Sequence, residues 1–274
     1  MEHDCLVNIF SRLGLDDLTV GVPFVCKSWS RASANPHCWR TLDFGSLDLK
    51  PSSPFAKRCA SLYYPSRFTF SGFLKLAIAR SHGAALDLRF SPLFPASLQV
   101  LSCASNGCPK LKALGLPRIC MEDEGRFFEL LGKWRKLEWL EMESKPSMLA
   151  NLARQIGHHC EKFQGLKIRG SIGKEDVAAI VESLPKLRFL DLSGSRLAKE
   201  EVLAVVDGCR DLKRFSLNDC LGFEADEEVK RRASGIEELE LEGCRIGDEA
   251  AADEDGDLEQ MMMYYDDCFL LWMF

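Results

Sequence analysis

The chain has 274 residues and a formal net charge of −6, with 46% hydrophobic and 28% charged residues. This length and composition predict a folded protein that buries a core without needing disulfides or metal ions. No apolar run reaches the roughly 18 to 20 residues of a membrane span, and the N-terminus lacks the basic and apolar segments of a secretory signal. We therefore expect no membrane association, a reducing compartment (cytoplasm, nucleus or both), and free thiols at the 12 cysteines.

Residues 1–44 predict three short helices. The first has one apolar face, at Leu6, Ile9, Phe10 and Leu13. Asp16 is suited to cap a second helix that runs to Val22, and a third follows Pro23 and is marked by Val25, Cys26 and Trp29. About 45 residues are marginal as an independent unit, so we expect this segment to lean on a partner or on the rest of the chain.

Residues 45–79 predict a linker, because three prolines and several serines interrupt any regular pattern. Near its end, Phe73, Leu76, Ala77 and Arg80 have helical spacing and predict a helix that leads into the next region.

Residues 80–250 contain about seven copies of one repeat. The pattern L-x-x-L-x-L recurs every 24 to 26 residues, at Leu111-Leu114-Leu116, Leu137-Leu140-Met142, Phe163-Leu166-Ile168, Leu187-Leu190-Leu192, Leu212-Phe215-Leu217 and Ile236-Leu239-Leu241. A weaker copy, Gly83-Leu86-Leu88, precedes them. Apolar residues at i, i+3, i+4 and i+7 lie before most copies and predict one helix between successive strands. One such unit cannot bury both of its faces, so the units must stack.

Five cysteines keep a fixed place in this repeat. Cys108, Cys160 and Cys209 precede the first Leu by three residues, and Cys220 and Cys244 follow it by eight. No C-x-x-C or H-x-x-x-H pair occurs, so we expect no metal site. A thiol is a small apolar group, and we expect these five to pack in the core.

The repeat C-x-x-L-x-x-L-x-L-x-x-C resembles the cysteine-containing leucine-rich repeat. The resemblance implies an α/β fold, a short right-handed solenoid with parallel strands on its concave face and helices on its convex face. The positions between and after the leucines then form three columns on the concave face. The first column is Ala113, Trp139, Gly165, Phe189, Arg214 and Glu238, and the second is Gly115, Glu141, Lys167, Asp191, Ser216 and Glu240. The third is Pro117, Glu143, Arg169, Ser193, Asn218 and Glu242. From these columns we expect substrate-binding residues at Trp139, Glu141, Lys167, Phe189, Asp191 and Arg214. Exposed aromatics flanked by charge are typical of binding hot spots; the alternative is that loops or the C-terminal segment cover Trp139 and Phe189.

The N-terminal segment closely resembles an F-box. The resemblance rests on Asp4 to Leu13, Leu15 to Leu18, the Val25-Cys26-Lys27-Ser28-Trp29 block, Asn35-Pro36 and Trp39-Arg40. The sequence from Pro23 to Trp29 is most similar to plant members of the family. It implies docking to the Skp adaptor of a cullin–RING ubiquitin ligase through Leu6, Ile9, Phe10, Leu13, Leu18, Val22, Val25 and Trp29. The same side chains could instead pack within the segment, and the sequence does not divide the two roles. The Leu-Pro pair that usually opens the motif is absent, which we expect to weaken docking.

Together the two resemblances imply the substrate-recognition subunit of an SCF-type ubiquitin ligase, which holds a protein substrate near the charged enzyme. The alternative is a ligase-independent leucine-rich-repeat scaffold that binds a protein. We expect no catalysis and no cofactor: His158 and His159 lie beside Cys160, but Cys160 occupies a core position of the repeat. Scattered Lys and Arg residues do not indicate nucleic-acid binding.

The C-terminal part has its own character. Residues 237–267 hold 13 acidic residues and one basic residue, a net charge of −12 that leaves +6 on the remainder of the chain. Residues 251–274 then form an acidic and apolar tail. It could cap the open end of the solenoid, remain disordered, or serve as a peptide ligand for a partner.

Overall fold

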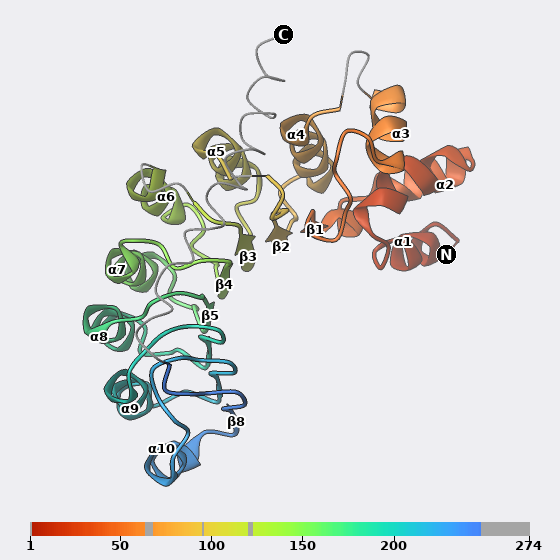
Figure 1. Cartoon of the computed structure of the whole chain (residues 1–274). Coiled ribbons are helices and arrows are strands. Elements are labelled where there is room, and N and C mark those ends of the chain that lie inside the picture. Colours follow the sequence, from red (N-terminus) through yellow and green to blue (C-terminus); the bar gives the residue numbers. More distant parts are fainter. Residues whose placement is uncertain (1, 64–67, 95, 120–122, 248–274) are drawn as a thin grey trace.

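The computed structural model describes residues 2–63, 68–94, 96–119 and 123–247. The predicted tail at 251–274 therefore lies outside the described residues. Within them, the chain forms an arc: parallel strands line its inner side and helices its outer side, with the N-terminal helices at one end (Figure 1).

The N-terminal segment consists of short helical pieces, as the sequence predicts. They are α1 (Glu2–Phe10), a π-helical turn η1 (Asp17–Gly21), the 3₁₀ turns η2 (Val22–Phe24) and η3 (Pro36–Trp39), and α2 (Lys27–Ser33). Asp16 lies at the N-cap position of η1, but its side chain accepts no capping hydrogen bond. The second predicted helix is therefore two tight turns, because Pro23 cannot donate to a continuing helical ladder.

In the described residues after the N-terminal segment, one eight-stranded parallel sheet follows the sequence order from β1 to β8. Its strands are β1 (Thr41–Asp43), β2 (Asp87–Arg89), β3 (Ala113–Leu116), β4 (Trp139–Met142), β5 (Gly165–Lys167), β6 (Phe189–Asp191), β7 (Arg214–Ser216) and β8 (Glu238–Glu240). The connecting helices are α3 (Pro54–Tyr63), α4 (Phe70–Ser81), α5 (Leu98–Gly107), α6 (Glu124–Leu131), α7 (Leu149–His159), α8 (Lys174–Ser183), α9 (Lys199–Gly208) and α10 (Glu227–Arg232), with a 3₁₀ turn η5 (Ala233–Gly235) before β8.

For the six strong copies the strand register agrees with the predicted columns. The weaker copy, Gly83-Leu86-Leu88, is wrong by two residues, because Leu88 and not Leu86 pairs with Leu114. The middle leucine of each repeat pairs with its equivalent in the next strand, and these residues are at most 1% exposed from Leu42 to Phe215. The last member, Leu239 of β8, is only half-buried. Four of the five repeat cysteines are buried as expected, and the fifth, Cys244, is half-buried just after the same strand.

Each repeat enters its strand through the same turn. The amide of the first Leu donates to the carbonyl three residues earlier, as in Leu137 to Trp134 (2.9 Å) and Phe163 to Cys160 (3.0 Å). The turn reverses the chain between helix and strand, so the repeat length can stay near 25 residues.

Two elements near residues 41–63 were not predicted. Strand β1 adds a repeat-like strand before the first sequence copy, and α3 occupies part of the predicted linker. Both form through packing rather than periodicity: Leu42 and Phe44 are fully buried, and the Phe44 ring meets Phe70 and Phe73 of α4 edge-on at 5.5 and 5.3 Å.

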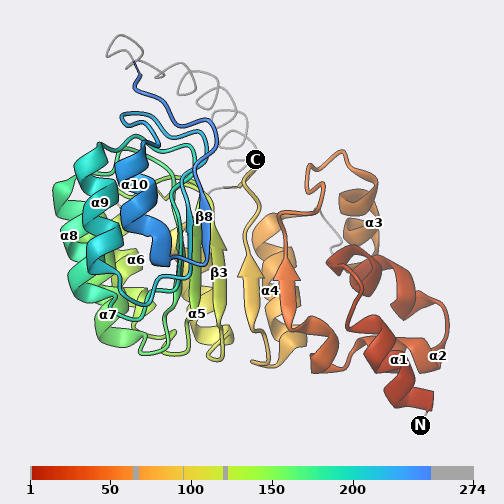
Figure 2. The same ribbon diagram turned by 90° about the horizontal axis from the view of Figure 1, so that it is seen from below.

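The N-terminal segment and the solenoid share one hydrophobic core. Trp39 lies two residues before β1 begins and is 2% exposed. Its indole Nε1 donates to the Ser33 carbonyl of α2 at 2.7 Å. On the other side, the Tyr63 hydroxyl of α3 donates to the Thr19 carbonyl of η1 at 2.9 Å. The expected support for the small helical unit therefore comes from the solenoid itself, and Figure 2 shows the helices seated against its first strands.

Candidate functional site

The eight predicted adaptor-binding residues divide into three groups. Phe10 and Leu18 are buried in the segment's own core, whereas Ile9 and Val25 are 57% and 61% exposed. The half-buried remainder packs against the core: Leu6, Leu13, Val22 and Trp29. The ring of Trp29 meets Phe10 edge-on with centroids 5.2 Å apart, which explains why it is only partly available.

Phe24 belongs with the exposed group, although the sequence did not single it out. It is 49% exposed and its ring lies 6.3 Å from that of Tyr63. Phe24 lies between Pro23 and Val25 in the 3₁₀ turn η2, so it belongs to no α-helical spacing pattern from which its exposure could be predicted. Ile9, Phe24 and Val25 are three large apolar side chains left on the surface of a segment of about 45 residues.

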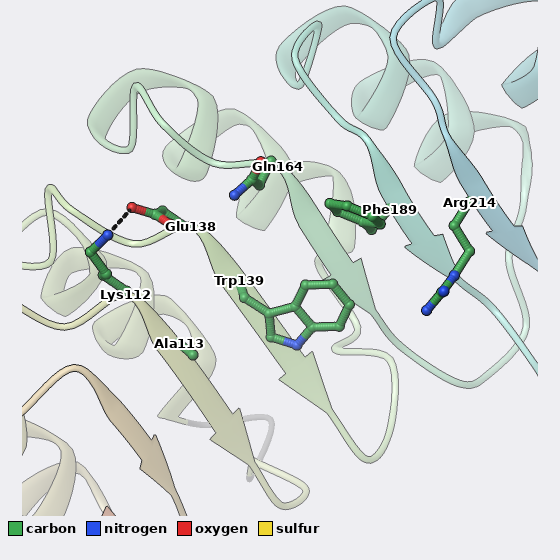
Figure 3. Close-up of a pocket in the computed structure, with 7 residues that line it drawn as sticks. All are labelled: Lys112, Ala113, Glu138, Trp139, Gln164, Phe189 and Arg214. Atoms are coloured by element: carbon green, nitrogen blue, oxygen red, sulfur yellow. Dashed lines mark hydrogen bonds and ion pairs between the residues drawn. The ribbon is translucent and has the colours of Figure 1, made fainter. Parts of the chain in front are cut away.

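On the concave face, Trp139 of β4 and Phe189 of β6 lie on strands that are separated by one strand, β5. Their register partner between them is Gly165 of β5. The two rings approach to 6.2 Å between centroids with a tilt of 51°, and both side chains are half-buried rather than covered (Figure 3).

Gly165 makes this aromatic pair possible. A Cβ at this position would lie 2.0 Å from Cε3 of Trp139, so the indole ring occupies the space that any other side chain would need. The sequence reasoning placed Gly165 in the column but did not recognise its role. The signal was a glycine between two aromatic residues in one register.

The second column is a network of charges. Glu141 of β4 lies 2.8 Å from the Lys167 ammonium and 3.9 Å from Arg89 of β2, whose guanidinium also contacts Asp87 at 3.3 Å. The hydrogen bond to Glu141 raises the pKa of Lys167, so this lysine stays charged. Asp191 accepts from the Ser193 amide at 2.9 Å and is half-buried. Three of the six predicted concave residues, Glu141, Lys167 and Asp191, thus lie in this column with defined partners.

Arg214 completes the predicted set. It is exposed and forms an ion pair with Glu238 of the next strand. Beside it, a pocket of about 270 Å³ is lined by Lys112, Ala113, Glu138, Trp139, Gln164, Phe189 and Arg214 (Figure 3). This volume is just below that of sites that enclose small molecules.

The third column differs at its first member. Pro117, which the alternation predicts on the concave surface, is buried. It follows β3 where the chain has left the regular strand, and strand alternation no longer applies there.

In the His158–His159–Cys160 sequence, Cys160 is buried in the core, as its place in the repeat predicts. Burial raises the pKa of the Cys160 thiol to about 11, and its Sγ lies 3.6 Å from the Trp134 carbonyl. The two histidine rings contact each other, with centroids 4.6 Å apart. In the described residues no three His, Cys, Asp or Glu side chains are grouped as metal ligands, and no helix is long and apolar enough to cross a membrane.

Comparison with known proteins gives the same two parts. Residues 3–45 match the F-box-like family. An F-box/LRR-repeat protein of Arabidopsis thaliana is 27% identical over 80% of this chain and 70% of its own length. The F-box protein SKIP19 of the same plant is 27% identical over 82% of this chain and 70% of its length, and putative F-box/LRR-repeat protein 23 is 26% identical over 82% of this chain but only 48% of its length.

Among solved structures, an internalin from Listeria monocytogenes covers 66% of this chain and 53% of its own, with a TM-score of 0.39 and 15% identity. The LRR ectodomain of the receptor kinase SOBIR1 from Arabidopsis thaliana covers 43% of this chain and 61% of its own, with a TM-score of 0.28 and 20% identity.

Proposed function

We propose that this chain, which has the F-box/leucine-rich-repeat architecture of its plant relatives, is the substrate-recognition subunit of an SCF-type ubiquitin ligase. The F-box-like segment docks to a Skp-family adaptor, and the concave face of the solenoid holds a protein substrate for ubiquitination. The chain performs no bond chemistry in this role. It raises the effective concentration of substrate lysines near an activated thioester.

The observation that carries the proposal is the continuous core between the two parts. Trp39, Leu42 and Phe44 are buried in a single run that leaves the F-box-like segment and enters the sheet. A rigid joint keeps a substrate on the concave face at a constant position relative to a ligase bound at α1 and η2. A flexible linker would lower the effective concentration of the substrate.

Adaptor docking is tested by co-purification with a Skp-family protein. We expect the double substitution Ile9→Asp and Val25→Asp to abolish capture, because both side chains are exposed and apolar. Leu93→Asp with Met148→Asp is the matched control, since these residues are 52% and 50% exposed and lie in the solenoid. If the unaltered chain captures no adaptor, and an added N-terminal Leu-Pro extension does not restore capture, the proposal fails.

Substrate holding is tested separately. Proteins captured by the full chain while the proteasome is blocked should be lost with Trp139→Ala or Phe189→Ala at nearly unchanged thermal stability. The ligase-independent scaffold is distinguished by partners whose abundance does not respond to Ile9→Asp with Val25→Asp. Surface variants are better here than deletion of residues 1–44, because deletion removes β1 and uncovers the core. We expect the protein to act in the cytoplasm, the nucleus or both, which a fluorescent fusion tests.

A further inference from the structure

Four lysines occupy one position in four consecutive repeats. Each precedes the first Leu and is the third residue of the turn that enters the strand, at Lys110, Lys136, Lys162 and Lys186. The turns are closed by amide-to-carbonyl distances of 2.9 to 3.2 Å. All four side chains are exposed. We call this set the lysine row.

The stacking of repeats aligns the lysine row along one edge of the sheet. The four turns lead into β3, β4, β5 and β6, which are neighbours in register. Neighbouring strands lie about 4.8 Å apart, so the ammonium groups gather along one rim. Figure 2 shows the turns between helices and strands at a common edge, at the tails of the arrows.

None of the four lysines forms an ion pair with a carboxylate in the part of the chain that the structure describes. Within the described ranges, Lys110, Lys136 and Lys162 have no acidic partner, and Lys186 donates only to the Glu161 carbonyl at 3.2 Å. Two other lysines near this edge do form ion pairs: Lys112 with Glu138 at 2.7 Å and Lys213 with Glu237 at 2.6 Å. The lysine row is thus a line of positive charge open to solvent.

Attraction to helix ends does not account for the row. Basic residues favoured by the helix dipole lie in the last turn of a helix. The last turns of α5, α6 and α8 have none, and that of α7 holds His158 and His159 rather than a lysine. The lysines stand beyond those helices, on the turns, where they are free to meet a ligand.

The lysine row adjoins the aromatic pocket. Lys112, Glu138 and Gln164 line the pocket, and each follows a lysine of the row by two residues. Arg188, two residues after Lys186, places its guanidinium carbon 6.0 Å from the centroid of Phe189. A chain that seats an apolar side chain on Trp139 and Phe189 therefore passes within reach of the row.

We propose that the lysine row and the aromatic pocket together bind an acidic protein segment that carries one large apolar side chain. The apolar group packs on Trp139 and Phe189, and carboxylates before or after it meet the lysines. As a statement about the ligase substrate this rests on the proposed function; as a statement about binding it stands by itself.

The test uses the full chain and a fluorescein-labelled peptide with one central phenylalanine flanked on each side by three glutamates. We expect binding that weakens about tenfold between low and high salt, because exposed charges are screened. Replacing the four lysines by glutamine should weaken binding about tenfold, and so should Trp139→Ala. The control changes four exposed lysines elsewhere to glutamine (Lys50, Lys57, Lys75 and Lys174) and should stay within about twofold of the unaltered chain.

Several outcomes overturn the proposal. Equal binding of peptides with lysine in place of glutamate removes the acidic requirement, and equal loss in the control variant removes the role of the row. Tighter binding of a single-stranded oligonucleotide that is insensitive to Trp139→Ala assigns the row to nucleic acid. If the peptide binds only after the carboxylates of residues 248–267 are changed to amides, the occupant is the chain's own C-terminal segment. The assay contains no ligase component, so failure to bind a Skp adaptor leaves this result intact.

Discussion

The solenoid and the F-box-like segment share one core but assign residues to it by different rules. In the solenoid, position in the repeat predicts burial: the middle leucine is buried in strand after strand. In the segment 2–45, position does not predict burial in this way. Phe10 is 2% exposed, whereas its neighbour Ile9, which the sequence predicts on the same apolar face, is 57% exposed. The difference arises because a repeat meets a copy of itself on each side, whereas a short helix meets whatever the chain folds against it.

This contrast predicts the largest effect at Phe10. Phe10→Ala removes a buried ring that packs edge-on against Trp29, and we expect it to lower the free energy of unfolding by ~3–5 kcal/mol. Ile9→Ala, one residue earlier, should cost less than about 0.5 kcal/mol but weaken capture of a Skp adaptor. Urea unfolding measures the first quantity and co-purification the second. Equal stability losses at both positions would remove the division between core and surface in α1.

Within the solenoid, the same repeat position should differ between β4 and β8. Leu140→Ala, at a fully buried position, should cost ~2–5 kcal/mol. Leu239→Ala, at the half-buried equivalent in β8, should cost about half as much or less, because less apolar surface is lost from the core. Denaturant midpoints of the two variants test this. A Leu239→Ala loss as large as that of Leu140→Ala would show that β8 is covered.

An intermediate loss of unfolding free energy is expected at Gly165, where the first concave column has a glycine between two aromatic residues. Gly165→Val places a side chain where the Trp139 ring lies, and the forced displacement should cost ~1–3 kcal/mol. Near-ultraviolet circular dichroism should change as the indole moves. Gly125→Val is the control, since a Cβ there meets no atom within 4 Å. An unchanged dichroism spectrum would contradict the stacking of the indole over β5.

The cysteines extend the contrast to chemistry. Cys5 and Cys26 in the F-box-like segment are exposed, whereas burial raises the pKa of Cys108 to about 12 and that of Cys209 to about 11. Under native conditions at pH 8, iodoacetamide should modify Cys5 and Cys26 but leave Cys108 and Cys209 unmodified. Mass spectrometry of the labelled peptides decides the matter, and rapid labelling of Cys108 would contradict its place in the core.

The same shifts predict a loss of stability in alkali. An unfolded thiol has a pKa near 9, so above that pH the unfolded chain releases protons that the folded chain retains. Each raised thiol therefore contributes its full stability below about pH 9 and loses it as the pH rises toward 11 or 12, by about 1 kcal/mol at pH 10. Cys209→Ala should flatten this dependence between pH 9 and 11. Identical slopes for the variant and the unaltered chain would contradict the assignment.

The sequence by itself determined the repeat and the register of its six strong copies, because a strand with a period of two and a unit of about 25 residues fix how such units stack. It misplaced the weak first copy by two residues. It also indicated the helical nature of the N-terminal segment. Only the tertiary structure decided which of the eight adaptor candidates face solvent, that Phe24 joins them, and that β1 and α3 tie the segment to the solenoid. It also decided that Trp139 reaches across Gly165 to Phe189. These features depend on contacts between side chains far apart in the chain, whose packing no local period encodes.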